Sequence, residues 1–96
     1  MKLESTCYSN YKLVIGEDDK PIAVQINGKI AFRLNDKVKV KGDIRGYICP
    51  GIKTPGIGKI VDIRRDSTDY FFGVRMENGE FGYMKDSRMT LCQDSF

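Results

Sequence analysis

Basic side chains are concentrated in the middle third of the chain. Residues 37–65 carry eight lysines and arginines against two aspartates, a local charge of +6. Residues 1–36 are neutral and residues 66–96 carry −3, so the whole chain of 96 residues has a net charge of only +3. A cluster of cations of this kind attracts a polyanionic partner, because it creates a positive potential over one part of the surface.

The middle third therefore predicts a nucleic-acid-binding surface, for DNA or RNA. In this interpretation cations contact phosphates, which position the nucleic acid, while an aromatic ring stacks on a base. The residues predicted to form the site are the cations Lys37, Lys39, Lys41, Arg45, Lys53, Lys59, Arg64 and Arg65 and the rings Tyr47 and Phe71.

Two other interpretations of the same residues stay open. Lys37, Lys39 and Lys41 alternate with Val38 and Val40, so the lysines form an outward row that could serve only to keep a sheet edge soluble. Alternatively, the chain is a protein-interaction module of bacterial or phage type, which docks on a larger cytosolic machine or pairs through an edge strand. Salt-sensitive binding to heparin or DNA would distinguish nucleic-acid binding from a protein partnership.

The side chains that most enzymes and metal sites use are scarce. The chain has no histidine, which excludes Ser-His-Asp and Cys-His nucleophile pairs. Cys7, Cys49 and Cys92 form no Cys-x-x-Cys pair, so a closed zinc site is not expected. At Cys49 an inert loop thiol is preferred over one whose pKa is lowered by Arg45 and Lys53, which are near in sequence. We expect no enzyme activity, no cofactor and no metal.

Export and membrane signals are not found either. The first seven residues contain no apolar h-region, and no apolar run exceeds four residues. Widely spaced cysteines in odd number are typical of reduced thiols in the cytosol. The sequence thus predicts a cytoplasmic protein without a membrane partner.

The hairpin that would position Phe71 is built around Asn78-Gly79. Asn-Gly between β-rich runs is the strongest short-range hairpin signal. A two-residue loop would put one apolar set on a buried face, Phe72, Val74, Met76, Phe81 and Tyr83, with Glu77 facing Glu80. A three-residue loop would instead make a ligand platform on the outer face, from Phe71, Arg75, Phe81 and Tyr83. The first register is preferred, because a buried face requires such a set.

A second pair, Asn27-Gly28, predicts a hairpin nearer the N-terminus. Here a two-residue loop would scatter apolar residues over both faces. A three-residue loop from Ile26 to Gly28 would pair Val24 with Ile30 and gather the apolar side chains Ile22, Val24, Ile30, Phe32 and Leu34. The sequence therefore predicts a type I turn with a glycine bulge here, and a positive φ at both Gly28 and Gly79.

The order of the predicted elements indicates an all-β fold. After the N-terminal elements come a strand at 37–41, a long irregular loop at 42–55, three meandering strands, one 3₁₀ turn and a short last strand, which is the order of an SH3-like barrel. We expect a single domain over 1–96, with the barrel at 36–92 and an added N-terminal strand and hairpin at 11–35. The expected core is Val38, Val40, Ile60 or Val61, Ile63, Phe72, Val74, Met76 and Leu91.

Two segments resemble known families of such barrels. Asp36-Lys-Val-Lys-Val-Lys-Gly42, followed by Gly56-Ile-Gly-Lys-Ile-Val-Asp-Ile63, resembles the KOW motif of ribosomal proteins and transcription elongation factors, with a longer insertion between the halves. Residues 70–80, followed by Met89-Thr-Leu91, are similar to the end of Tudor-like domains. The Tudor resemblance implies recognition of methylated lysine or arginine, which needs a cage of three or four aromatic rings. Both resemblances support the SH3-like barrel more strongly than any one activity.

Overall fold

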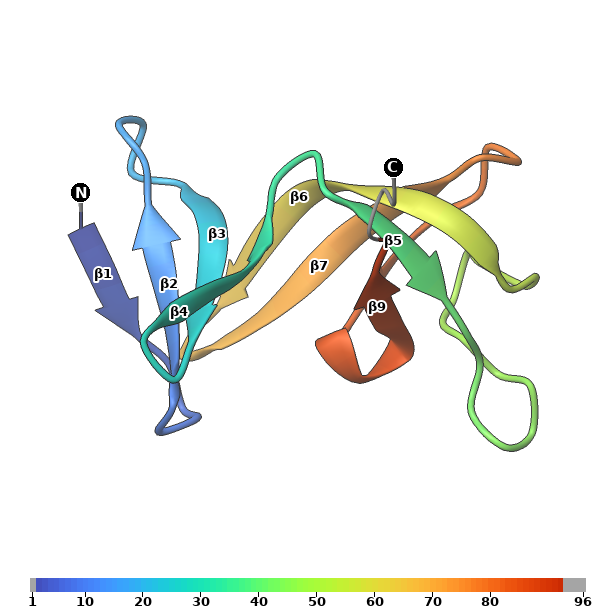
Figure 1. Ribbon diagram of the computed structural model, residues 1–96, viewed down its shortest axis with the longest axis horizontal. Coiled ribbons are helices and arrows are strands. Elements are labelled where there is room, and N and C mark those ends of the chain that lie inside the picture. The colour runs from blue at the N-terminus through green and yellow to red at the C-terminus, as the bar shows by residue number, and fades with distance from the viewer. Residues whose placement is uncertain (1, 93–96) are drawn as a thin grey trace.

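The computed structural model describes residues 2–92, and in this range the fold is all-β. A four-stranded antiparallel sheet consists, in order, of β1 (Lys2–Ser5), β2 (Tyr11–Ile15), β3 (Pro21–Ile26) and β4 (Lys29–Arg33). A five-stranded antiparallel sheet has the order β8-β7-β6-β5-β9 (Figure 1). Its strands are β5 (Lys37–Val40), β6 (Gly56–Asp66), β7 (Asp69–Met76), β8 (Phe81–Met84) and β9 (Met89–Leu91), with a 3₁₀ turn at Asp86–Arg88.

The element order predicted from residue 37 onward is observed, but the five-stranded sheet is open. Within the described residues its edges are β8 and β9, so no closed barrel is present. The four-stranded sheet has one strand more than the sequence predicts, because residues 2–5 pair with β2. No helix in residues 2–92 is long and apolar enough to cross a membrane.

One hydrophobic core is shared by the two sheets. Leu13, Val24 and Phe32 enter it from the first sheet, and the Phe32 ring lies 5.2 Å from the ring of Phe72 in β7. The two longest strands, β6 and β7, run from the five-stranded sheet toward the four-stranded one (Figure 1). The long loop between β5 and β6 also contributes to the core, through Ile48, Cys49 and Ile52.

The predicted register of the first hairpin is wrong. Ile26 pairs directly with Lys29, and Asn27 and Gly28 have φ of 52° and 82°, so the turn contains two residues. The extra residue is Ala31, since Val24 pairs with Phe32 and Gln25 with Ile30. A bulge beyond the turn restores the alternation of the strand, so a tight turn and a buried Val24–Phe32 pair coexist. Ile22 and Ile30 are consequently exposed, although the positive φ of Gly28 is confirmed.

The preferred register of the second hairpin is also wrong, and the three-residue alternative is observed. Arg75 pairs with Phe81, and the Met76 amide donates to the Glu80 carbonyl over 2.7 Å. The predicted positive φ of Gly79 is confirmed at 94°. Gly82 explains this register, because a Cβ there would lie 2.7 Å from both Cys49 Sγ and the Pro50 carbonyl. The loop thus fills the space inside β8, and the large rings on either side of Gly82 must point outward.

A bulge in β6 decides which of its residues enter the core. The register against β7 shifts between Ile60 and Asp62, which leaves Val61 as the extra residue. Ile60 and Ile63 are therefore both buried, whereas Val61 is 39% exposed. Of the expected core, Val38, Val40, Phe72, Val74 and Met76 are also buried, but Leu91 in the edge strand β9 is 42% exposed, so its assignment was wrong.

Truncation of one valine on the inner face and one valine at the bulge should show which of the two positions is buried. Val74 is fully buried, so Val74→Ala should lower the free energy of unfolding by about 1–3 kcal/mol. Val61→Ala removes the same atoms from the exposed bulge, and it should change the free energy of unfolding by no more than about 0.5 kcal/mol. Denaturant unfolding of both variants measures the difference, and equal losses would contradict the placement of the bulge.

Candidate functional site

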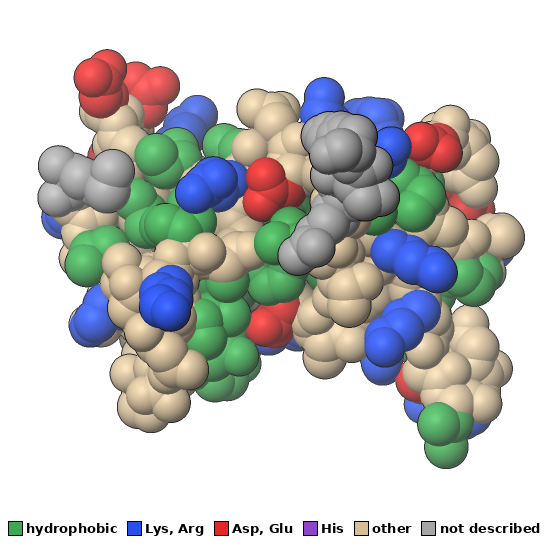
Figure 2. Space-filling view, in the orientation of Figure 1, with side chains coloured by type: hydrophobic (Ala, Val, Ile, Leu, Met, Phe, Trp, Pro, Cys, Tyr) green, Lys and Arg blue, Asp and Glu red, His purple; other side chains and the backbone are tan. Residues whose placement is uncertain are grey.

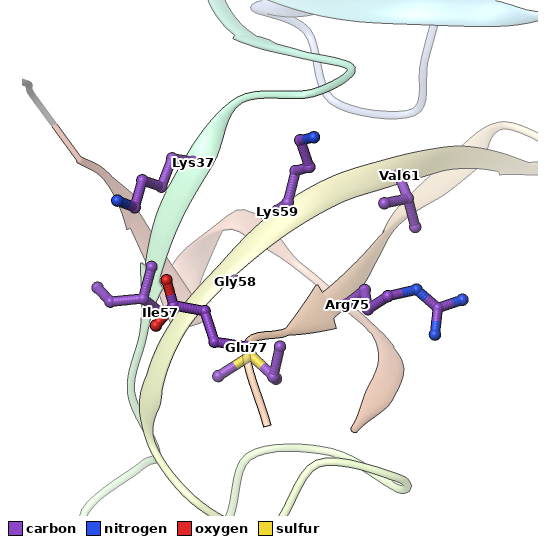
Figure 3. Close-up of a pocket in the computed structure, with 8 residues that line it drawn as sticks. Lys37, Ile57, Gly58, Lys59, Val61, Arg75 and Glu77 are labelled. Carbon is purple, nitrogen blue, oxygen red and sulfur yellow. The ribbon is translucent and has the colours of Figure 1, made fainter. Parts of the chain in front are cut away.

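A row of cations crosses the outer face of the five-stranded sheet. Lys37 in β5 pairs with Lys59 in β6, and Lys59 pairs with Arg75 in β7. Residues directly opposite one another on neighbouring strands project to the same face. Figure 3 shows the three side chains on adjacent strands, with their charged ends spread apart. Such like-charged neighbours destabilise a sheet by a few tenths of a kcal/mol or more, so the row has a cost for folding.

Aromatic rings continue this row toward β8. Arg75 pairs with Phe81, and Arg64 pairs with Phe71. The rings of Phe81 and Tyr83 meet edge to face at 5.3 Å, with Arg75 lying 5.4 Å from the Phe81 ring centre and Arg64 lying 5.7 Å from that of Tyr83. We call the outward surface of β5–β8 the basic–aromatic face, formed by Lys37, Lys39, Lys59, Arg64, Arg75, Phe71, Phe81 and Tyr83.

Gly73 allows the two rings of β8 to lie against the sheet. A Cβ at this position would approach Tyr83 Cε1 to 3.0 Å and Phe81 Cζ to 3.2 Å. The Tyr83 hydroxyl donates to the Asp62 carboxylate over 2.7 Å, and this hydrogen bond raises the pKa of Tyr83. The phenol therefore stays protonated at neutral pH and its ring is held in one orientation.

The basic–aromatic face contains two hollows. One, of about 460 Å³, is lined by Phe71, Phe81 and Tyr83 together with Arg64, Asp66, Pro50 and Gly82. The other, of about 340 Å³, lies among Lys37, Lys59 and Arg75, with Val61, Ile57 and Glu77 at its sides (Figure 3). The first hollow thus offers flat apolar surfaces beside the Arg64 guanidinium and the Asp66 carboxylate. The second has a largely apolar lining, with three cations and the Glu77 carboxylate around it.

The cations of this face are available to a ligand. Within residues 2–92, none of Lys37, Lys39, Lys59, Arg64 and Arg75 takes part in an ion pair. The strand that carries Lys37 and Lys39 is not an edge, because β5 lies between β6 and β9. Protection of a free edge therefore does not explain these lysines. Figure 2 shows basic side chains over the end of the molecule formed by β5 and the loop after it.

The structure brings together only part of the predicted site. Five of its residues, Lys37, Lys39, Lys59, Arg64 and Phe71, share the basic–aromatic face. Four others, Lys41, Arg45, Tyr47 and Lys53, lie outside the strands, in or beside the loop at 41–55. Arg45 is paired there with Asp43 over 3.1 Å.

Arg65, a predicted site residue, does not belong to this face. It projects from the opposite side of β6 and is paired with Glu4, while it also donates to the Asp19 carbonyl over 2.7 Å. Arg75, Phe81 and Tyr83 also lie on this face, but they were not among the predicted site residues. The three-residue register of the Asn78-Gly79 hairpin was the signal that could have identified them, since it places all three outside.

The three cysteines differ in exposure, with Cys7 exposed, Cys49 buried and Cys92 partly exposed. All three are free, and burial raises the pKa of the Cys49 thiol, so the alternative of a lowered pKa is wrong. No group of three potential metal ligands occurs among residues 2–92.

A second aromatic group joins the two sheets and already holds a cation. The Lys85 ammonium lies 4.1 Å from the ring centre of Tyr70, 4.5 Å from that of Tyr8 and 5.2 Å from that of Phe71. It also contacts the Asp69 carboxylate at 2.6 Å. Tyr8 precedes β2, and its hydroxyl donates to the same carboxylate over 3.1 Å. The cluster therefore ties the start of the four-stranded sheet to β7 and β8.

This cluster should give the protein a specific sensitivity to acid. The hydrogen bond from Lys85, helped by those from the Tyr70 amide and Tyr8, lowers the pKa of Asp69 from its ordinary value of 3.8. The ionised carboxylate then stabilises the folded state above that value, and the contribution is lost as the pH falls through the lowered pKa. Asp69→Asn should reduce the melting temperature at pH 7, and the difference from the unaltered protein should shrink below about pH 4.

Thermal melts of the two proteins between about pH 3 and pH 7 measure this effect. Asp18→Asn is the matched control, because Asp18 is exposed to solvent in the turn between β2 and β3. A difference between Asp69→Asn and the unaltered protein that stays constant down to pH 3 would show that the charge of Asp69 is not involved.

Comparison with protein-family models, curated proteins and solved structures finds no match for this chain. Within the described residues, the basic–aromatic face offers cations without ion-pair partners and half-buried aromatic rings.

Proposed function

We propose that the protein is a non-enzymatic nucleic-acid-binding module, whose basic–aromatic face contacts the phosphate backbone. The observation that carries the proposal is the register Lys37–Lys59–Arg75, which aligns three cations across three neighbouring strands. Lys39 and Arg64 add two further positive charges on the same face. Five cations that share one face can neutralise several phosphates at once.

The cost of the cation row supports this proposal. An exposed like-charged pair destabilises the fold, and here no acidic partner within the described residues relieves it by an ion pair. A bound polyanion would relieve the repulsion along the whole row. Because the row lies in the middle of the sheet, solubility of an edge is not an alternative reason to keep it.

We also propose that residues 36–92 have an SH3-like arrangement of strands, with the barrel left open between the edge strands β8 and β9, in keeping with the resemblance to KOW and Tudor-like modules. Two features support it: the order of the elements, and the return of β9 to pair beside β5 after the 3₁₀ turn. The four-stranded sheet would then be an N-terminal addition that shares the core of the barrel.

Binding should depend steeply on salt. If about four cations meet phosphates, the logarithm of the binding constant should fall with the logarithm of salt concentration with a slope of about −3 to −4. The triple variant Lys37→Gln, Lys59→Gln and Arg75→Gln should reduce the steepness by about two to three units, since each lost phosphate contact removes close to one. Titration of labelled DNA and RNA, beginning at about 50 mM salt, measures both quantities.

A second triple variant controls for net charge. Lys12, Lys20 and Lys29 are exposed on the four-stranded sheet and its turns, and their replacement by glutamine removes the same number of charges. The slope should then stay close to that of the unaltered protein. The proposal fails if neither DNA nor RNA binds at low salt, or if both triple variants weaken binding equally.

A protein partner remains the second candidate, and one observation favours it. Ile44 is fully exposed at the outer tip of the loop between β5 and β6. The tip is ordered by hydrogen bonds, because the Asp43 carboxylate accepts from the amides of Arg45 and Tyr47 over 2.8 Å and 3.1 Å. A large apolar side chain held in this way could anchor the domain in a pocket of a partner protein.

Ile44→Ser tests this alternative. If the tip anchors a protein, the variant should lose a partner that co-purifies with the unaltered protein in high salt, while its melting temperature is unchanged because Ile44 buries no surface. Retention of every such partner by Ile44→Ser would exclude the tip as an anchor. Nucleic-acid titration of the same variant shows whether the two candidate surfaces act separately.

A further inference from the structure

We infer that the ligand of the basic–aromatic face is single-stranded nucleic acid, with a base stacked in the hollow between Phe71 and Tyr83. This inference rests on the proposed function and adds the class of nucleic acid. Cations alone do not distinguish a duplex from a single strand, because both present phosphates. The three rings do, because the flat face of a base is free to stack on a side chain only when the base is not stacked inside a duplex.

The three rings lie outside the hydrophobic core of the protein. Phe71, Phe81 and Tyr83 are half-buried on the outward side of the sheet, while Phe72, Val74 and Met84 fill the inward side. They line a hollow of about 460 Å³, which lies within the range of about 300–1,000 Å³ typical of small-molecule sites. A hollow with aromatic walls on a sheet face suits a planar group such as a nucleobase.

The rings are also held in place before a ligand arrives. Tyr83 is oriented by its hydrogen bond to Asp62 and by the edge-to-face contact with Phe81. Both rings rest over Gly73, where a side chain would displace them. Stacking on rings that are already ordered loses little conformational entropy, which favours binding.

Cations flank the aromatic hollow on the side where a backbone would run. Arg64 lines the hollow and pairs with Phe71, so a phosphate next to the stacked base can meet its guanidinium. From Phe81 the row continues through Arg75 and Lys59 to Lys37, across three inter-strand steps of about 4.8 Å, or roughly 14 Å in all. A strand of a few nucleotides could thus place one base in the hollow and its following phosphates along the row.

The test compares single-stranded and double-stranded probes on the same protein. Labelled oligothymidine and oligouridine of about 12 nucleotides match the ~4–16 nucleotide sites of single-strand binders, and a mixed-sequence DNA duplex of equal length is the competitor. Either single strand should bind at least about tenfold more tightly than the duplex, because stacking of one base contributes about 1–3 kcal/mol. Fluorescence anisotropy at two salt concentrations measures each constant.

Variants of the rings separate stacking from charge. Phe71→Leu and Tyr83→Leu keep apolar bulk but remove the aromatic face, and each should weaken single-strand binding by roughly 5- to 150-fold. The salt slope should not change, because no phosphate contact is lost. Tyr83→Phe retains the ring and should bind nearly as well as the unaltered protein. Tyr47→Leu, in the loop outside the hollow, is the matched control and should have no effect.

The possible outcomes distinguish this inference from the proposed function. Equal affinity for single strands and the duplex, with no effect of the leucine variants, would overturn the inference while leaving a phosphate-binding face in place. A loss confined to Tyr47→Leu would move stacking to the loop and also overturn it. Absence of binding to every probe would reject the proposed function itself. Circular dichroism and melting temperature of each variant confirm that a loss of binding is not a loss of fold.

Discussion

The bulge at Val61 is the constraint on which the rest of the structure depends. β6 is the longest strand, and it must present Ile60 and Ile63 to one core although they are three residues apart. A regular strand repeats its facing every two residues, so only an extra residue between them allows both to be buried. The same shift directs Arg64 outward to the basic–aromatic face and Arg65 to the other side, where it pairs with Glu4. Core packing and the composition of the site are thus decided at one position.

The aromatic part of the face follows from a second, long-range constraint. The loop at 41–55 packs Cys49 and Ile52 against the inner side of β8 at Gly82. This contact leaves no room for a side chain at Gly82 on the inner side. Phe81 and Tyr83, on either side of it in the sequence, therefore face outward. The three-residue turn at 77–79 is the adjustment that lets β7 and β8 pair in this register.

The charges of the molecule are divided between structure and surface. Arg65 in β6 joins the two sheets through Glu4 in β1, and the Lys85–Asp69 pair at the end of the five-stranded sheet reaches the other sheet through Tyr8, which donates to Asp69. Arg45 is paired with Asp43 within its own loop. In contrast, the cations of the basic–aromatic face have no ion-pair partner within residues 2–92. The net charge of +3 therefore understates the positive charge near this face, because most acidic residues lie in other parts of the chain.

The sequence by itself determined the features that depend on residues close together in the chain. The two Asn-Gly turns, the positive φ of Gly28 and Gly79, the alternation of β5 and the all-β order of elements all follow from local backbone preferences and side-chain period. It also identified Lys37, Lys39, Lys59, Arg64 and Phe71, which do share one face.

Only the tertiary structure decided the registers, and with them the remaining residues of the basic–aromatic face. Each hairpin sequence allowed two registers, and the preferred one was wrong in both. The physical reason is that a shift of one residue turns every side chain to the other face, so the choice depends on what each face packs against. For β8 that surface is a loop some thirty residues away at Cys49, and for β6 it is the core shared with the other sheet. In both strands, the residues that decide which side chains face outward lie far away in the sequence from those side chains.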